Sequence, residues 1–273
     1  MKYGLILFFI FVITPSVMAD TIGVENDIKN TTPARVVSRE DGGNHYIFQN
    51  AYEYSNVDQG SRKGLWRVFS HRIGYLYDNL PAPYIDIIQD ERLGETDYAY
   101  ELGAYLTIPQ GYVHMAAGFS SARDFLYSWR VLAECENNIL PNINFHCNAR
   151  FSHYDLGDVS LFSPGLIYYF GNNYIMGHYG ISHTEGRGNA QFVTGKLYIS
   201  ANERFSFYLG GAFGQRLYDI LLLDASQEDG YISFAGIEVN CSDNINAVLE
   251  YSYAEEDPSF IKRSIRAQLK VVF

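Results

Sequence analysis

The sequence has few basic residues, few cysteines and little metal-binding character. The 20 Lys and Arg residues stand against 31 Asp and Glu residues, which gives a formal net charge of −11 at pH 7. This balance argues against a nucleic-acid partner, because proteins that bind nucleic acids present a basic stripe to the phosphates. The 3 Cys and 7 His residues are scattered along the chain, without the close spacing of a zinc site. We therefore expect no bound metal and no cofactor.

Long apolar runs are also missing, except at the start of the chain. Lys2 precedes an apolar stretch at 4–13, and small residues at 17–19 follow Pro15. The pattern is typical of a secretory signal peptide with cleavage after Ala19, since a membrane-spanning helix needs about twenty apolar residues and this run has about ten. No later run is long enough to cross a membrane as a helix. A membrane-bound mature protein must therefore cross as strands.

What the chain does contain is aromatic residues and a regular alternation. It has 23 Tyr, 18 Phe and 24 Gly, and its last ten residues place Ile265, Ala267, Leu269, Val271 and Phe273 on one side of an extended strand. Polar residues occupy the other side. A tilted strand of about ten residues crosses a bilayer. We predict that this strand closes an outer-membrane β-barrel and that Phe273 is the signal read by the barrel-assembly machinery.

Turn residues divide the chain after residue 44 into fourteen strand candidates. They are predicted at 45–55, 65–77, 84–93, 98–108, 111–120, 126–137, 143–154, 158–170, 173–184, 190–200, 204–214, 230–240, 244–254 and 264–273. Tight turns alternate with longer excursions, the longest at 217–229 and 255–263, as expected when both termini lie in the periplasm. The fold class is therefore all-β.

We predict a transmembrane antiparallel up-and-down barrel at 45–273. It has about fourteen strands, with twelve or sixteen as alternatives. A flexible periplasmic tail is expected at 20–44, after the signal peptide at 1–19. The expected location is the outer membrane of a Gram-negative cell, in contact with outer-membrane lipid.

Several short motifs occur in order between residues 84 and 198. They lie at 90–97 and 104–109, at 118–121 before Phe125, at 150–154 before Asp158 and Val159, and at 168–174. Together they resemble the pattern of YaiO-type outer-membrane β-barrels. The resemblance implies a channel-like barrel with a role in exopolysaccharide export or at the cell surface. Because this chain has no periplasmic helical repeat, a role in export implies a separate periplasmic polysaccharide-export partner.

Strand parity assigns charged and polar side chains to the lumen. The lumen-lining candidates are Arg92, Glu101, His114, Arg130, Glu134, His146, Arg150, Lys196, Arg204, Glu238, Glu250, Arg266 and Lys270, together with Asp86, Asp90, Asn144, Asn148 and Gln268. A barrel of this size has a narrow polar lumen, between the filled interior of eight strands and the aqueous channel of sixteen. Two hypotheses stay open. The lumen is a path for a hydrophilic solute such as an oligosaccharide, or its charges pair inside a closed structural or adhesive barrel.

Serine and histidine are neighbours in the sequence at three places. These are Ser70-His71, Ser152-His153 and Ser182-His183. Adjacent residues of a strand point to opposite faces, so none of the pairs forms a nucleophile and base by itself. We expect no enzyme activity, and a hydrolase at the outer rim is the least favoured alternative.

Two cysteines lie symmetrically about a predicted turn. Cys135 and Cys147 are equally distant from Pro141 and fall on the same face of the predicted hairpin. They form a cross-strand disulfide, or they remain two reduced thiols facing lipid. Cys241 lies in another turn and has no predicted partner. The apolar run at 217–224 either folds inward as a constriction or extends the strands above the membrane.

Overall fold

A computed structural model describes residues 45–60, 62–77, 80–121, 125–155, 157–186, 188–215, 229–256 and 260–273. The predicted signal peptide at 1–19, the tail at 20–44 and the apolar run at 217–224 lie outside the described residues. Within the described ranges, no helix is long and apolar enough to cross a membrane.

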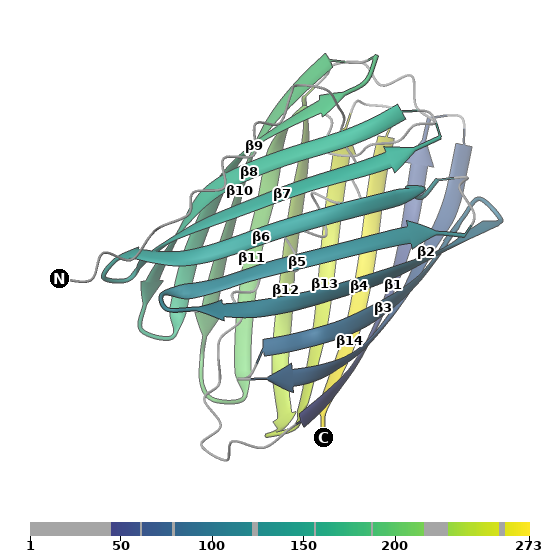
Figure 1. The fold of residues 1–273 in the computed structure, drawn as a ribbon. Helices are drawn as coiled ribbons and strands as arrows, with labels where there is room; N and C mark the ends of the chain where they lie inside the picture. Colours follow the sequence, from purple (N-terminus) through teal and green to yellow (C-terminus); the bar gives the residue numbers. More distant parts are fainter. Residues whose placement is uncertain are drawn as a thin grey trace.

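Fourteen antiparallel strands close into one barrel (Figure 1). They are β1 (His45–Gln59), β2 (Arg62–Tyr77), β3 (Leu80–Arg92), β4 (Glu95–Ile108), β5 (Gly111–Ser120), β6 (Trp129–Leu140), β7 (Ile143–Tyr154), β8 (Gly157–Phe170), β9 (Asn173–Thr184), β10 (Gly188–Ser200), β11 (Phe205–Gln215), β12 (Asp229–Ser242), β13 (Ile245–Glu256) and β14 (Phe260–Val272). Each strand pairs with its neighbours in sequence, and β14 pairs with β1. The predicted fourteen-stranded up-and-down barrel is confirmed.

The barrel closes where its first and last strands meet. The backbone N–H groups of Tyr46 and Phe273 each donate to the other residue's carbonyl oxygen, at 3.1 and 2.9 Å. Closure leaves no unpaired edge among the fourteen described strands, which is what a lipid environment requires of a sheet. This end also carries the tight turns at 109–110, 141–142 and 171–172, and we call it the turn end. The opposite end is the loop end. Short turns face the periplasm in barrels of the bacterial outer membrane.

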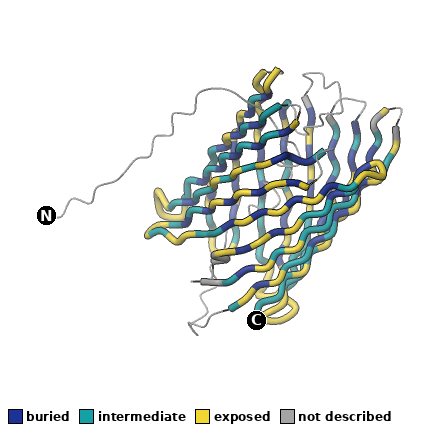
Figure 2. The backbone as a smooth tube through the Cα atoms, turned by 45° about the vertical axis from the view of Figure 1, so that its right-hand side comes forward, coloured by how far each residue is buried: buried dark blue, intermediate teal, exposed yellow. Residues whose placement is uncertain are grey.

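Buried and exposed residues alternate along the strands (Figure 2), as expected when successive side chains face the interior and the outside in turn. In β9, Tyr174, Met176 and His178 are buried, whereas Ile175 and Tyr179 are exposed. The outward face is apolar around the barrel, as in Leu102, Phe119, Leu166, Leu209, Phe213, Leu249 and Leu269. In outer-membrane barrels, the bilayer covers an apolar outer band, and polar residues lie above and below this band.

The main departure from the predicted strands is at the start of β6. The strand was expected to begin at residue 126, but it begins at Trp129. Residues 125–128 instead turn into the barrel, and we call them the inward segment. The backbone N–H groups of Phe125 and Leu126 donate to Oδ2 of Asp97 at 3.0 and 2.9 Å. A carboxylate distant in sequence thus removes these residues from the strand, and alternation alone cannot reveal it.

Candidate functional site

The candidate site is the interior of the barrel, where most of the predicted lumen residues lie. Inward positions hold Asp86, Asp90, Arg92, Glu101, His114, Arg130, Glu134, Asn144, His146, Asn148, Arg150, Lys196, Glu238, Glu250, Arg266, Gln268 and Lys270. Arg204 is the exception. It is exposed in the turn between β10 and β11, because β11 begins one residue later at Phe205. Arg204 therefore does not line the barrel wall, and that prediction is wrong.

The half of the interior nearest the turn end is built from tyrosines, histidines and carboxylates. Tyr84 Oη and His114 Nε2 are 2.6 Å apart. The His114 ring stacks on Tyr105, with centroids 4.0 Å apart and an interplanar angle of 8°. Tyr112 Oη donates to Glu134 Oε1 at 2.6 Å. Aromatic rings and hydrogen-bond acceptor oxygens thus lie side by side on the inward faces of β3 to β6.

Glu134 connects this group to the next strands. His146 Nε2 lies 3.3 Å from its Oε1, and His114 Nδ1 lies 3.7 Å from its Oε2. The His146 ring in turn stacks on His178, with centroids 4.7 Å apart. A buried carboxylate is stable only when polar partners replace its water, and Glu134 has two imidazoles and a phenol. In the part of the chain that the structure describes, no group of three or more His, Cys, Asp or Glu could hold a metal ion.

Further tyrosines continue the same chemistry around the wall. Tyr169 Oη donates to Glu136 Oε1 at 2.9 Å, and Tyr174 stacks on Tyr198 with centroids 5.0 Å apart and an interplanar angle of 8°. On β11, a seventh tyrosine donates its hydroxyl to Oε2 of Glu250 at 2.8 Å. We call the whole set the tyrosine belt: Tyr84, Tyr105, Tyr112, Tyr169, Tyr174, Tyr198 and Tyr208. The belt was not predicted from the sequence, although the inward parity of these tyrosines could have indicated it.

Ion pairs neutralise the charges along the wall. Three of them join inward side chains of neighbouring strands or of strands two apart: Arg72–Asp86 at 2.7 Å, Arg130–Glu101 at 2.8 Å and Lys262–Glu53 at 2.9 Å. The first is bidentate, since Nε and Nη2 of Arg72 each donate at 2.7 Å. Arg72, Glu53 and Lys262 were not among the predicted lumen residues, and Lys262 lies before the strand predicted at 264–273. Within each of these pairs, the two opposite charges neutralise each other on a polar wall.

The half of the interior nearest the loop end holds two apolar clusters together with a buried ion pair, in which Arg92 Nη2 lies 2.7 Å from Asp90 Oδ2. One cluster of buried side chains follows the wall from β8 to β2 and includes Leu161, Phe192, Ile232, Phe234, Ala254, Phe260, Val57 and Trp66. A second cluster packs Leu126 and Tyr127 of the inward segment against Ala99, Tyr154 and Val159. Tyr127 is only 2% exposed. The inward segment thus fills space inside the barrel and narrows its loop end.

Comparison with known proteins agrees with this architecture. The family model of the YaiO membrane beta barrel domain matches residues 48–219. The chain belongs to this family. No individual curated protein matches the sequence. As a family member, the chain is an outer-membrane β-barrel.

Solved outer-membrane proteins share the fold of this YaiO-family barrel. Omp33 of Acinetobacter baumannii superposes with a TM-score of 0.53 at 14% identity, covering 84% of this chain and 99% of that one. The TodX monoaromatic hydrocarbon channel gives 0.56 at 8% identity, covering 90% and 93%. A bacterial polysaccharide outer membrane secretin gives 0.54 at 7% identity, covering 84% and 98%. At these identities the likeness concerns the fold alone.

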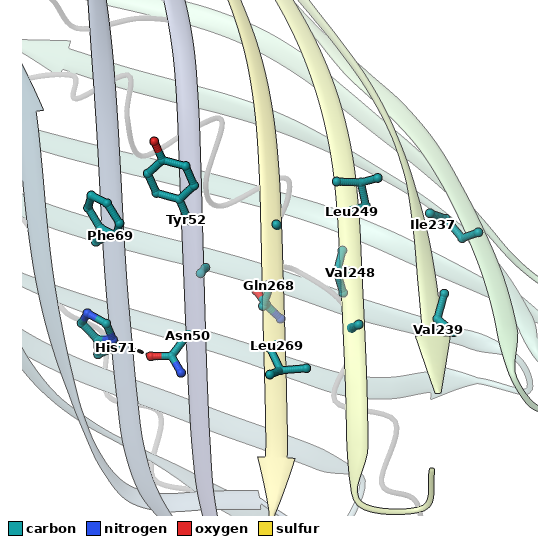
Figure 3. Close-up of a pocket in the computed structure, with 13 residues that line it drawn as sticks. Asn50, Tyr52, Phe69, His71, Ile237, Val239, Val248, Leu249, Gln268 and Leu269 are labelled. Carbon is teal, nitrogen blue, oxygen red and sulfur yellow. Dashed lines mark hydrogen bonds between the residues drawn. The ribbon is translucent and has the colours of Figure 1, made fainter. Parts of the chain in front are cut away.

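The outer wall of the YaiO-family barrel carries a shallow apolar groove that crosses β12, β13, β14, β1 and β2 (Figure 3). Most of its lining residues hold outward positions, such as Ala247, Ala267 and Leu269. His71 Nδ1 and Asn50 Oδ1 form a polar pair in it, 2.5 Å apart. This groove faces lipid, so it is separate from the interior that a solute would follow.

The cysteines of the predicted hairpin are direct partners. Cys135 of β6 lies opposite Cys147 of β7 in the register, and both hold outward positions. The two thiols are free in the structure, as is the exposed thiol of Cys241. The opposed register agrees with the sequence analysis, and the disulfide between Cys135 and Cys147 stays a prediction.

Proposed function

We propose that this YaiO-family barrel is a narrow channel for a hydrophilic solute, with an oligosaccharide or an exopolysaccharide strand as the favoured class. The observation that carries the proposal is the tyrosine belt. Sugar rings pack their C–H faces on aromatic rings, and their hydroxyls donate to carboxylate and phenol oxygens. The stacked faces of Tyr105 and Tyr174, with Glu134 and Glu250 beside them, combine both kinds of group on one wall.

The turn end of the channel faces the periplasm in this proposal. A solute that leaves the cell would reach the tyrosine belt first, delivered by a separate periplasmic polysaccharide-export partner. The signal peptide and the barrel-assembly machinery would bring the chain to this membrane, with cleavage after Ala19. The solute path itself needs no chemical step.

The inward segment regulates passage in this proposal. Asp97 holds its backbone, and the guanidinium of Arg92 lies 4.9 Å over the Phe125 ring. Movement of this segment would widen the loop end. A second candidate function, a closed structural or adhesive barrel, is favoured by the apolar packing of the loop half.

Single-channel conductance of the refolded mature protein in planar bilayers tests the proposal. We expect small conductance steps that added maltohexaose blocks from the periplasmic side. Asp97→Ala should give larger steps, because the inward segment loses the acceptor of two backbone N–H groups. Silence from both folded proteins would contradict the channel and support the closed barrel.

A further inference from the structure

Three polar side chains form a row on the outward face at the loop end. Ser160 of β8 lies directly opposite His183 of β9, and His183 lies directly opposite Asn189 of β10. Directly opposed residues of an antiparallel pair have Cβ atoms about 4.5–5.5 Å apart. The imidazole therefore stands between a hydroxyl and an amide, on three consecutive strands.

The amide orients the imidazole. Nδ1 of His183 is hydrogen-bonded to Oδ1 of Asn189. An amide oxygen only accepts, so the proton of this bond belongs to Nδ1, and Nε2 of the neutral ring keeps its lone pair. Within the described part of the chain, no hydrogen bond joins the Ser160 hydroxyl to His183 or to another group, so the bond to Nε2 would form on substrate binding. A hydroxyl, a basic nitrogen and an orienting amide are the three parts of a nucleophile–base–orienter triad.

The neighbouring polar groups are engaged elsewhere. Ser182 precedes His183 in sequence but is buried on the inward face, so it lies on the wrong side of the wall. Asp158 holds the outward position nearest to Ser160 towards the rim and is hydrogen-bonded to Nδ1 of His153. Asn189 is thus the group that orients His183.

The row lies at the edge of the apolar outer band. Phe162 follows Ser160 on the same face towards the turn end, and it lies opposite Ile181 of β9. These two side chains are 49% and 42% exposed, and Val193, two residues beyond the β10 partner of Ile181, is 50% exposed. The boundary between acyl chains and headgroups lies where an apolar band meets polar groups. The acyl esters of glycerolipids occupy that same boundary, because they link the chains to the headgroup.

We propose that Ser160, His183 and Asn189 form an esterase site for acyl esters of membrane lipids, separate from the channel. His183 Nε2 accepts the Ser160 proton as Oγ attacks the ester carbonyl carbon. The bond from that carbon to the alcohol oxygen breaks, and the alcohol leaves with the proton from His183. Water then attacks the acyl-serine, which releases the fatty acid and returns the proton to Ser160.

Covalent labelling of the full-length barrel in detergent micelles tests the nucleophile. A fluorophosphonate probe should modify Ser160, as located by peptide mass mapping. Ser160→Ala should abolish the label, and His183→Gln should slow labelling at least about 100-fold, which is the usual scale of a lost general base. Ser233→Ala is the matched control, because Ser233 is an exposed outward serine opposed by Gly211 and Tyr253. It should leave labelling unchanged.

Fatty-acid release from phosphatidylethanolamine vesicles tests the substrate. Wild-type barrel should release fatty acid, and Ser160→Ala should not. Asn189→Ala should lower the rate about 10-fold or more, while Asn189→Asp restores it, because an acidic oxygen also accepts from Nδ1. Heat-modified electrophoretic migration identifies the folded barrel in every sample. Wild-type labelling no faster than that of folded Ser160→Ala, or fatty-acid release that survives Ser160→Ala, would overturn the proposal.

Discussion

The two halves of the barrel interior differ in how their buried side chains are stabilised. In the turn half, buried groups such as Glu134 and Tyr112 are polar and depend on directed hydrogen bonds. In the loop half, side chains such as Ile232 and Phe192 pack into an apolar cluster, which lies in the same half as the buried ion pair of Arg92. Polar contacts can be exchanged for contacts with a solute, whereas apolar packing excludes water. In the channel that we propose, recognition therefore belongs to the turn half and closure to the loop half.

The largest expected effect concerns the apolar half. Phe260→Ala should lower the free energy of unfolding by about 3–5 kcal/mol, because a fully buried phenyl ring leaves a cavity. Phe260→Leu is the control and should cost less than about 1.5 kcal/mol. Urea unfolding of the refolded barrel, followed by tryptophan fluorescence, measures both. A loss below about 1 kcal/mol for the alanine variant would mean that the loop half is no packed core.

The next effect contrasts the polar interior with the lipid face at the same height. Leu269→Arg should destabilise the barrel by about 2–4 kcal/mol if the position lies at the bilayer midplane, because the new charge faces hydrocarbon. Gln268→Arg introduces the same charge one residue away, on the inward face. It should be tolerated much better, since Glu238 and other polar groups line that side. Equal losses in urea unfolding from lipid vesicles would mean that the two faces are misassigned.

A smaller effect on stability, with a clear effect on conductance, is expected where the halves meet. Asp97→Ala should cost about 1.5–3 kcal/mol, the worth of hydrogen bonds to a charged group, and should increase single-channel conductance. Asp97→Asn keeps an acceptor oxygen for Phe125 and Leu126 and should remain closer to wild type. Unchanged conductance in a folded Asp97→Ala barrel would mean that the inward segment does not control passage through the channel.

The smallest effect on stability tests recognition in the polar half. Tyr105→Leu should cost about 0.5–1.5 kcal/mol, because the stack with His114 is lost, and it should weaken block by maltohexaose. Tyr100→Leu alters a neighbouring outward tyrosine and should leave block unchanged. Titration of block against sugar concentration in planar bilayers compares the two. Equal block of the wild-type and Tyr105→Leu channels by maltohexaose would mean that the tyrosine belt does not bind the solute.

For much of the barrel wall, the alternation of apolar and polar residues in the sequence predicts which side chains face inward and which face outward. The outward positions of Leu249 and Leu269 and the inward positions of Glu101 and His114 follow from period two within a single strand. Arg204 shows the limit of this reasoning. Counting alternate residues assigns it to the inward face, but the strand ends before it and Arg204 lies in a turn. The start of β6 shows another limit, since Asp97 captures backbone groups that alternation had placed in the strand.

Partners across strands could not be predicted in the same way. Register shifts occur at the β2–β3 and β6–β7 pairs, and each shift changes which residues face one another further along. Ser182 is the neighbour of His183 in the sequence, whereas the register places Ser160 opposite that residue. Tyr169 with Glu136 and Lys262 with Glu53 are likewise contacts that only the paired strands define.

The sequence by itself determined that this chain forms a barrel of about fourteen strands, with an apolar outside and a charged inside. Those properties are local, because a strand's two faces depend only on the order of its own residues. The tertiary structure decided the tyrosine belt, the inward segment and the row of Ser160, His183 and Asn189. These depend on the register between strands, which the closure of the whole ring sets through hydrogen bonds between residues far apart in the chain.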